Sequence, residues 1–134
     1  MRYWEALGHR AIAFVPEHHL SYERVGRSNR AASLGLTDKK HNADDVPLLR
    51  RLEAEGSLVV TPPQDYDDSY CISYARNNGG CVVSNDLYRD YSEAEARRGR
   101  SKAAADAWRR AHVISFTFFV DEFLPNPEFA FPQP

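Results

Sequence analysis

The chain has 134 residues, a formal net charge of −2 and ordinary shares of hydrophobic (43%) and charged (27%) residues. This length predicts a single domain over residues 1–134 with one modest core. No apolar run approaches the roughly 20 residues of a membrane helix, and the first residues lack the layout of a signal peptide. We therefore expect a cytoplasmic or nuclear protein with no membrane partner. The two cysteines, Cys71 and Cys81, form neither a disulfide framework nor a zinc pattern.

Four short apolar runs have the composition of buried strands. They are rich in β-branched and aromatic residues, and each is short or bounded by proline or polar turn residues. Their apolar residues do not alternate with polar ones, which favours strands that are covered on both faces. The four runs are Ala11 to Val15, Leu58 to Thr61, Cys81 to Ser84 and Val113 to Val120.

Helical patterns lie between these runs. Asp44 is a candidate N-cap for a helix that carries Pro47 in its first turn and ends at Gly56. The segment DDSYCISYARNNGG, residues 67–80, predicts a second helix that ends at its paired glycines.

A third helix is predicted to begin at Ser92, because Glu95 follows it at capping-box spacing. It continues through alanine-rich sequence to Trp108, and Gly99 weakens its middle. Strands and helices thus alternate along the chain, which predicts β-α-β crossovers and a mostly parallel sheet of α/β class.

Two segments do not fit this alternation. The first is a long basic loop over residues 17–43, and loops of this length are usually functional or disordered. The second is the Pro-rich tail over residues 125–134, which we expect to be extended. The basic residues of the loop are Arg24, Arg27, Arg30, Lys39 and Lys40.

Four aspartates follow two of the predicted strands. Asp67 and Asp68 come after the second strand, while Asp86 and Asp90 come after the third. Ligands bind at the carboxyl ends of parallel strands, so these side chains are candidates for one site, and crowded carboxylates suit Mg²⁺ or Mn²⁺. A structural role is the alternative, because Asp68 fits an N-cap and Asn85 with Asp86 fits a turn.

The motif VVSNDLYRDY, residues 82–91, resembles the signature of the NYN/PIN-like ribonuclease domain of Regnase-type proteins, which usually bear a CCCH zinc finger. The segment DVPLLRRLEAEGSLVVTPPQDYDDSY resembles the helix, third strand and paired-aspartate turn of that domain. AIAFVP resembles its second strand, and FTFFVDEFLPNP its last strand and Pro-rich exit. Nearly the whole chain is covered, although it contains no CCCH finger.

The resemblance implies a PIN-like three-layer α/β fold and a Mg²⁺- or Mn²⁺-dependent endoribonuclease that cuts single-stranded or loop RNA, with a role in mRNA decay. It also implies that the four aspartates are catalytic. Asp68 and Asp86 are the first-choice metal ligands. Asp67 and Asp90 act through water or orient the nucleophile. Asn85 and Arg89 shape the loop, with a phosphate contact the alternative for Arg89.

One departure from the family pattern affects both fold and activity. The family domain opens with a central strand that ends in an Asp-Gly-Ser-Asn type motif, and this chain has no such segment. The strand is therefore expected either to lie upstream in a longer protein, to be replaced by a second copy in a homodimer, or to be lost with its neighbours pairing directly. A catalytically inactive pseudonuclease that binds RNA or a protein is the alternative function.

RNA contacts are expected from basic and aromatic side chains near the aspartates. An acidic metal site needs nearby cations to hold a polyanion, although charge on a helix is often only a solvated face. Tyr66, Tyr70 and Tyr88 are candidates for base stacking, whereas the helical spacing of Tyr70 and Tyr74 favours core packing or capping for these two. The basic candidates are Arg27, Arg30, Lys39, Lys40, Arg89, Arg97, Arg98 and Arg100.

Overall fold

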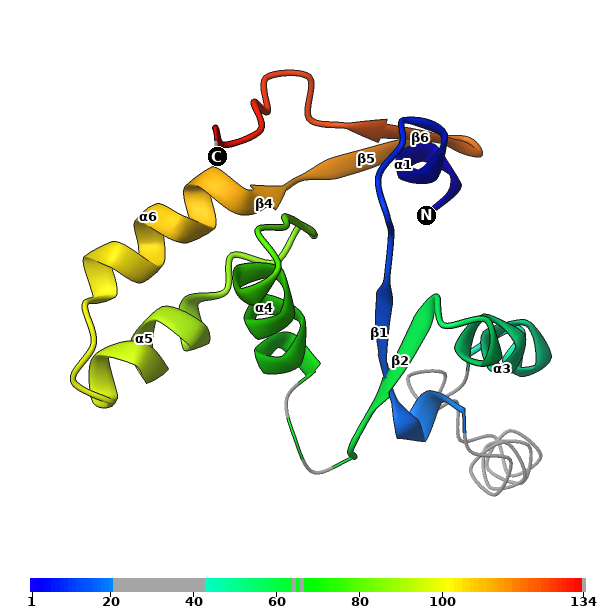
Figure 1. Ribbon diagram of the computed structural model, residues 1–134, viewed down its shortest axis with the longest axis horizontal. Helices are drawn as coiled ribbons and strands as arrows, with labels where there is room; N and C mark the ends of the chain where they lie inside the picture. The colour runs from blue at the N-terminus through cyan, green and yellow to red at the C-terminus, as the bar shows by residue number, and fades with distance from the viewer. Residues whose placement is uncertain (21–42, 64, 66, 134) are drawn as a thin grey trace, which may run out of the picture. The chain divides into compact units, whose positions relative to one another are not determined.

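The computed structural model describes residues 1–20, 43–63, 65 and 67–133 (Figure 1). The chain divides into two compact units, Met1–Asp67 and Asp68–Pro134, and each is described by itself. In both units helices alternate with short parallel strands, which confirms the predicted α/β class. The elements are α1 (Arg2–Ala6), β1 (Ala13–Pro16), the 3-10 helix η1 (Glu17–His19), α3 (Val46–Ala54), β2 (Leu58–Thr61), α4 (Asp67–Asn77), β3 (Val82–Val83), α5 (Arg89–Arg97), α6 (Lys102–His112), β4 (Val113–Ile114), β5 (Phe116–Phe119) and β6 (Glu122–Pro125).

A parallel pair of strands forms the centre of the first unit. β1 and β2 pair in a register that sets Ala13 opposite Leu58. The chain returns from β1 to β2 through α3, which packs on β2. Leu20, Val46 and Leu58 are buried together and form the core of this unit. The basic residues predicted between positions 21 and 42 lie outside the described residues.

Helix α3 follows from local sequence signals. The Asp45 carboxylate accepts a hydrogen bond from the Leu48 backbone N–H at 2.9 Å, so the N-cap is one residue beyond the predicted Asp44. Pro47 lies in the first turn as predicted, where its missing N–H leaves no helical bond unmade. Gly56 follows the helix with φ of 77°, a conformation that glycine adopts without strain.

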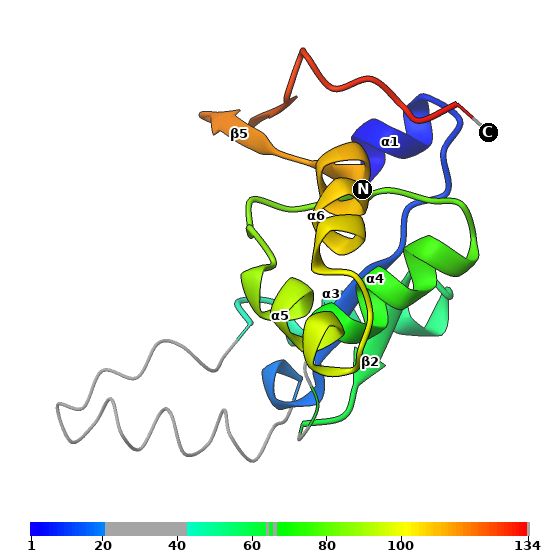
Figure 2. The ribbon, with the colours of Figure 1, turned by 90° about the vertical axis from the view of Figure 1, so that its left-hand side faces the viewer.

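The second unit contains a second parallel pair. β3 and β4 set Val82 opposite Val113, and α5 and α6 form the connection between the two strands. Figures 1 and 2 show α5 and α6 side by side. Helix α4 precedes β3, and its Ile72 and Ala75 are buried with Val82 and Tyr88 in one core cluster.

The predicted third helix is in fact two helices. Gly99 has φ of 77° and lies in the turn between α5 and α6. Ser101 caps the second of them, because its Oγ accepts a hydrogen bond from the Ala104 backbone N–H at 3.1 Å. We expected Gly99 only to weaken the middle of one helix. Instead, the left-handed backbone of Gly99 ends α5.

The predicted capping box at Ser92 is wrong. Helix α5 begins at Arg89, with Tyr88 as its N-cap residue, so Ser92 lies inside the helix. Its buried hydroxyl donates to the Asp106 carboxylate at 2.6 Å and thereby joins α5 to α6. Glu95 is also buried and accepts hydrogen bonds from Arg100. The hydrogen bonds of Ser92 and Glu95 are thus made with residues beyond α5, and the spacing of the two residues in the sequence does not reveal these partners.

The last apolar run, predicted as one buried strand, is split at Ser115. β4 pairs with β3, whereas β5 forms an antiparallel hairpin with β6. Phe118 and Phe119 on the hairpin are exposed, so burial of this part of the run is incorrect. The Pro-rich tail begins inside β6, and its Asn126 N–H donates to the Ser115 carbonyl at 2.8 Å.

The described strands form three two-stranded sheets rather than one continuous sheet. Among the described residues β1 has β2 as its hydrogen-bonded neighbour and β3 has β4, so each of these strands keeps one unpaired edge in this part of the chain. No helix in the described ranges has the length and apolarity to span a bilayer.

Candidate active site

The loop after β3 is fixed to the rest of the second unit by Asn85. Its amide nitrogen donates to the Phe116 carbonyl at 2.9 Å, and its amide oxygen accepts from the Phe116 N–H at 2.9 Å. This double hydrogen bond attaches the loop to the start of β5. The prediction that Asn85 shapes the loop is confirmed.

Asp86 lies on this loop, is exposed to solvent and takes part in two hydrogen bonds. Its backbone N–H donates to Ser84 Oγ at 3.0 Å, and its Oδ1 accepts from the Tyr88 N–H at 2.7 Å. The turn role weighed from the sequence is therefore correct for Oδ1. No hydrogen bond within the described ranges involves Oδ2, which leaves that oxygen accessible to a ligand.

Asp68 is the second residue of α4, and Ile72 and Ala75 of the same helix are buried together with Tyr88. Burial raises the pKa of Tyr88 to about 12. The Cys71 thiol and the carboxylates of Asp68 and Asp86 act in the same direction, while a hydrogen bond with Ser84 opposes them. Both carboxylates are thus within electrostatic reach of one phenol group, although they come from different elements.

The other two predicted carboxylates are less closely defined. Asp90 is exposed in the first turn of α5, and Asp67 begins α4, but its side chain lies outside the described residues. Within the described ranges there is no group of three or more His, Cys, Asp or Glu side chains placed to hold a metal ion. Asp68 is on the helix that packs against Tyr88, two residues after Asp86, and the carboxylate cluster stays a prediction.

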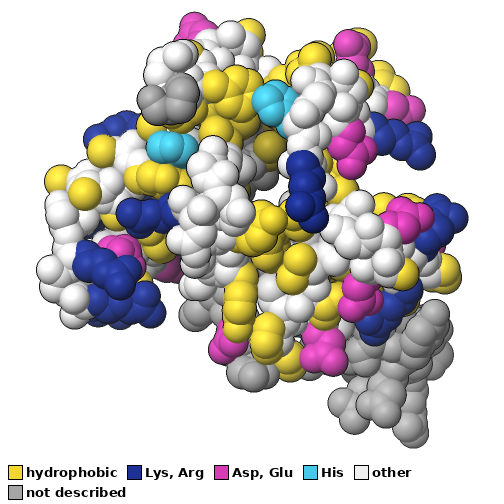
Figure 3. All heavy atoms as spheres, in the orientation of Figure 1, with side chains coloured by type: hydrophobic (Ala, Val, Ile, Leu, Met, Phe, Trp, Pro, Cys, Tyr) yellow, Lys and Arg dark blue, Asp and Glu magenta, His cyan; other side chains and the backbone are white. Residues whose placement is uncertain are grey.

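The predicted RNA-binding arginines at the end of α5 and in the turn after it are engaged with acidic neighbours. Arg100 Nη1 lies 3.1 Å from Glu95 Oε2, and Arg98 Nη1 lies 3.6 Å from Glu95 Oε1. Arg97 pairs more loosely with Glu93 at 3.9 Å. Figure 3 shows basic side chains gathered over the α5–α6 turn with an acidic one beside them.

All three arginine side chains are 66–74% exposed, so contact with RNA phosphates is sterically open to them. Arg89 begins α5 and is exposed as well. Arg27, Arg30, Lys39 and Lys40 lie outside the described residues.

The tyrosines differ from the sequence-based expectation. Tyr88 is 6% exposed and packs in the core of the second unit, so a role in base stacking is wrong for it. Tyr70 and Tyr74 on α4 are exposed, and core packing is wrong for them. Tyr66 lies outside the described residues.

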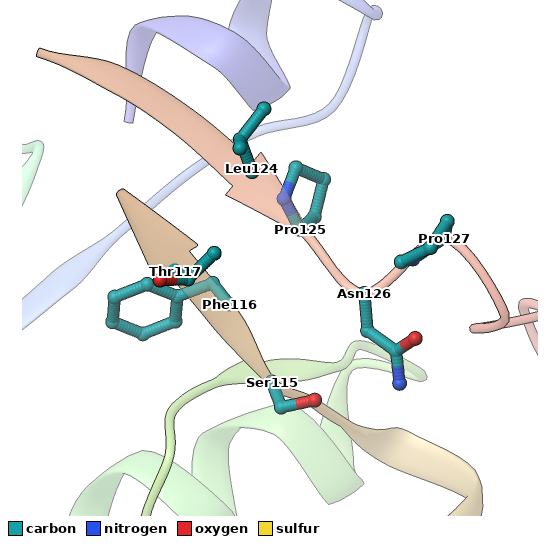
Figure 4. A pocket seen from close by; sticks show the side chains of 7 residues that line it. All are labelled: Ser115, Phe116, Thr117, Leu124, Pro125, Asn126 and Pro127. Atoms are coloured by element: carbon teal, nitrogen blue, oxygen red, sulfur yellow. The ribbon is translucent and has the colours of Figure 1, made fainter. Parts of the chain in front are cut away.

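A shallow groove of about 480 Å³ lies elsewhere in the second unit. Figure 4 shows the side chains that line it, from the start of β5 to the residues after β6. Its walls include Phe116, Leu124 and Pro125, and it contains no carboxylate. The groove is therefore separate from the Asp68 and Asp86 site.

The family of the chain follows from a match over residues 1–130 to the family described as Zc3h12a-like ribonuclease NYN domain. The chain belongs to this family. The resemblance of its SND and YDD motifs to a ribonuclease domain is thereby confirmed.

A solved structure supports the fold of this NYN domain. The crystal structure of nuclear proteinaceous RNase P 2 (PRORP2) from A. thaliana is similar over 90% of the chain, with a TM-score of 0.56 and 20% sequence identity. The chain spans 21% of the length of that protein. The likeness therefore concerns the fold alone, whereas family membership identifies the chain as a ribonuclease domain with RNA as its class of substrate.

Proposed function

We propose that this NYN domain is a divalent-metal-dependent endoribonuclease that hydrolyses phosphodiester bonds in single-stranded or loop RNA. The observation that carries the proposal is the packing of Tyr88 on α4. The Tyr88 N–H holds the Asp86 carboxylate, and its ring is buried with Ile72 of the helix that contains Asp68. Two negative groups that approach one another repel, and a cation between them offsets that repulsion.

The donor set fits Mg²⁺ or Mn²⁺, because both prefer hard oxygen ligands and use few protein carboxylates together with water. Asp68 and Asp86 are the residues proposed to hold the ion, and Asp86 offers its accessible Oδ2. A divalent cation held there would polarise the phosphate and lower the pKa of a water molecule bound to the cation. Asp67 and Asp90 are proposed to bind through water or to orient the attacking water.

The basic residues of the second unit are proposed to hold the RNA backbone. Arg89 begins the helix whose first turn also contains Asp90, so its guanidinium is a candidate for a phosphate contact near the site. Arg97 and Arg98 extend the positive surface along α5. Arg27, Arg30, Lys39 and Lys40 are proposed to add contacts from the basic loop.

The Asp86→Asn variant tests the proposal. Asparagine keeps the oxygen that accepts from the Tyr88 N–H, so the turn is retained while the negative charge is removed. We expect Mn²⁺ binding to weaken at least about 10-fold and cleavage of unstructured RNA to fall similarly. Asp121→Asn, an exposed carboxylate on the hairpin of the same unit, is the matched control and should change neither.

The result that contradicts the metal site is equally specific. If Asp86→Asn unfolds the domain while the folded fraction binds Mn²⁺ as tightly as the unchanged chain does, Asp86 is only a turn residue. If RNA changes mobility without being shortened, and chelator has no effect, the pseudonuclease function replaces the enzymatic one.

A further inference from the structure

The turn that carries Asp86 closes on itself through Ser84 and Tyr88. Ser84 Oγ accepts from the Asp86 N–H at 3.0 Å, and Asp86 Oδ1 accepts from the Tyr88 N–H at 2.7 Å. Both the backbone and the carboxylate of Asp86 are therefore held by these two neighbours.

The backbone of Tyr88 is unusual for a residue with a side chain. Its φ and ψ of 48° and 39° are left-handed, a region in which bulky residues are rare. Its ring is buried with Ile72, Ala75 and Val82, so packing holds the residue in this conformation. Strained residues persist where the surrounding structure over-determines them, and they concentrate at functional sites.

The packing of Tyr88 also relates it to the second carboxylate. Its ring is buried with Ile72 of α4, and Asp68 lies one helical turn before Ile72 on the same helix. A buried ring anchored in the core is a rigid reference point, whereas Asp86 is on an exposed loop. The distance between the two carboxylates therefore depends on how well the loop is tied to that ring.

We infer that Ser84 and Tyr88 are positioning residues, which orient the Asp86 carboxylate so that Oδ2 faces a divalent cation shared with Asp68. The inference rests on the proposed function, because it assumes that the hydrogen bonds of Asp86 with Ser84 and Tyr88 serve metal binding. Neither residue touches the cation. They act by removing the rotational freedom that Asp86 would otherwise lose on binding, and preorganised ligands bind more tightly for that reason.

The first experiment titrates the full chain with Mn²⁺ alone. Ser84→Ala removes the acceptor of the Asp86 N–H and should weaken Mn²⁺ binding about 10-fold. This is the lower end of the loss in metal affinity that follows when a residue hydrogen-bonded to a metal ligand is mutated. Tyr88→Phe keeps the buried ring and the backbone N–H that donates to Asp86, so Mn²⁺ affinity and thermal stability should change little. Ser84→Thr retains a hydroxyl and should restore much of the affinity. Ser115→Ala is the matched control.

The second readout requires no metal. NMR couplings of the Asp86 side chain should report one χ1 rotamer in the unchanged chain and averaging among rotamers in Ser84→Ala. If the unchanged chain binds no Mn²⁺ but this averaging is seen, the positioning role holds and the metal proposal fails. If Ser84→Ala leaves both the couplings and the Mn²⁺ affinity unchanged while Asp86→Asn abolishes binding, the positioning role is refuted and the metal site holds.

Discussion

Arg100 and Arg97 lie three residues apart, and both were candidates for RNA binding, yet the structure gives them different effects on folding. Arg100 Nη1 is 3.1 Å from both carboxylate oxygens of Glu95, whose side chain is 5% exposed. Arg97 is 3.9 Å from Glu93, and both of those side chains are exposed. We therefore expect Arg100→Gln to destabilise the second unit, with Arg97→Gln as the matched control.

The magnitude follows from the burial of each acidic partner. A hydrogen bond to a charged group contributes about 1.5–3 kcal/mol, but Arg100 is itself 66% exposed, so water offsets part of its loss. Arg98, at 3.6 Å, also keeps Glu95 partly paired. The free energy of unfolding should fall by about 1–2 kcal/mol for Arg100→Gln, and by no more than about 0.5 kcal/mol for Arg97→Gln.

Urea unfolding, followed by circular dichroism and tryptophan fluorescence, measures the difference. Trp108 is half-buried on α6 and reports on the helix pair that Arg100 joins. Equal losses for the two variants, or a larger loss for Arg97→Gln, would refute the claim that the buried Glu95 carboxylate depends on Arg100.

Three further predictions concern pH, RNA binding and chain length. Because burial raises the pKa of Tyr88 from 10.0 to about 12, the unfolded chain ionises first, so stability should be lost as pH rises from 10 to 12. Tyr88→Phe should lose less in the same alkaline denaturation series, and an equal loss would contradict the assignment. Arg97→Gln should lower the slope of log affinity for single-stranded RNA against log salt by about 0.7, and an unchanged slope would make Arg97 a solvated surface residue. A longer chain, with an upstream strand that ends in aspartate, should melt at higher temperature and cleave RNA faster, and equal melting and cleavage by the 134-residue chain would contradict this.

Local signals in the sequence were sufficient for α3 and β2. Pro47 and Gly56 depend on backbone conformations that each residue type favours in any context, so the start and end of the helix were predicted to within a residue or two. The second predicted strand, Leu58 to Thr61, has the bounds of β2.

Side chains satisfied by distant partners were not predicted correctly. Ser92 and Glu95 have the spacing of a capping box, but they bind Asp106 and Arg100, which belong to the next helix and to the turn before it. The sequence likewise did not reveal that the ring of Tyr88 is buried. Burial of that ring depends on α4 and β3, which pack on it from earlier positions in the chain.

The candidate site was predicted in part. Asp68 and Asp86 were expected near one another because both follow strands of a parallel fold, and the structure packs Tyr88, two residues after Asp86, on the helix that contains Asp68. The hydrogen bond from the Asp86 N–H to Ser84 was not predicted, since it depends on the geometry of a turn that ends at the left-handed Tyr88. Asp67 and Asp90 stay predictions.

The most direct test of endoribonuclease activity uses a circular single-stranded RNA, which has no ends for an exonuclease to attack. With Mn²⁺, the unchanged chain is predicted to convert the circle to linear products, and EDTA is predicted to stop the reaction. The paired variant Asp68→Asn, Asp86→Asn should fold and leave the circle intact, while Asp121→Asn should cut it at the normal rate. Undiminished cutting by the paired variant, or cutting in EDTA, would contradict a metal-dependent site built on Asp68 and Asp86.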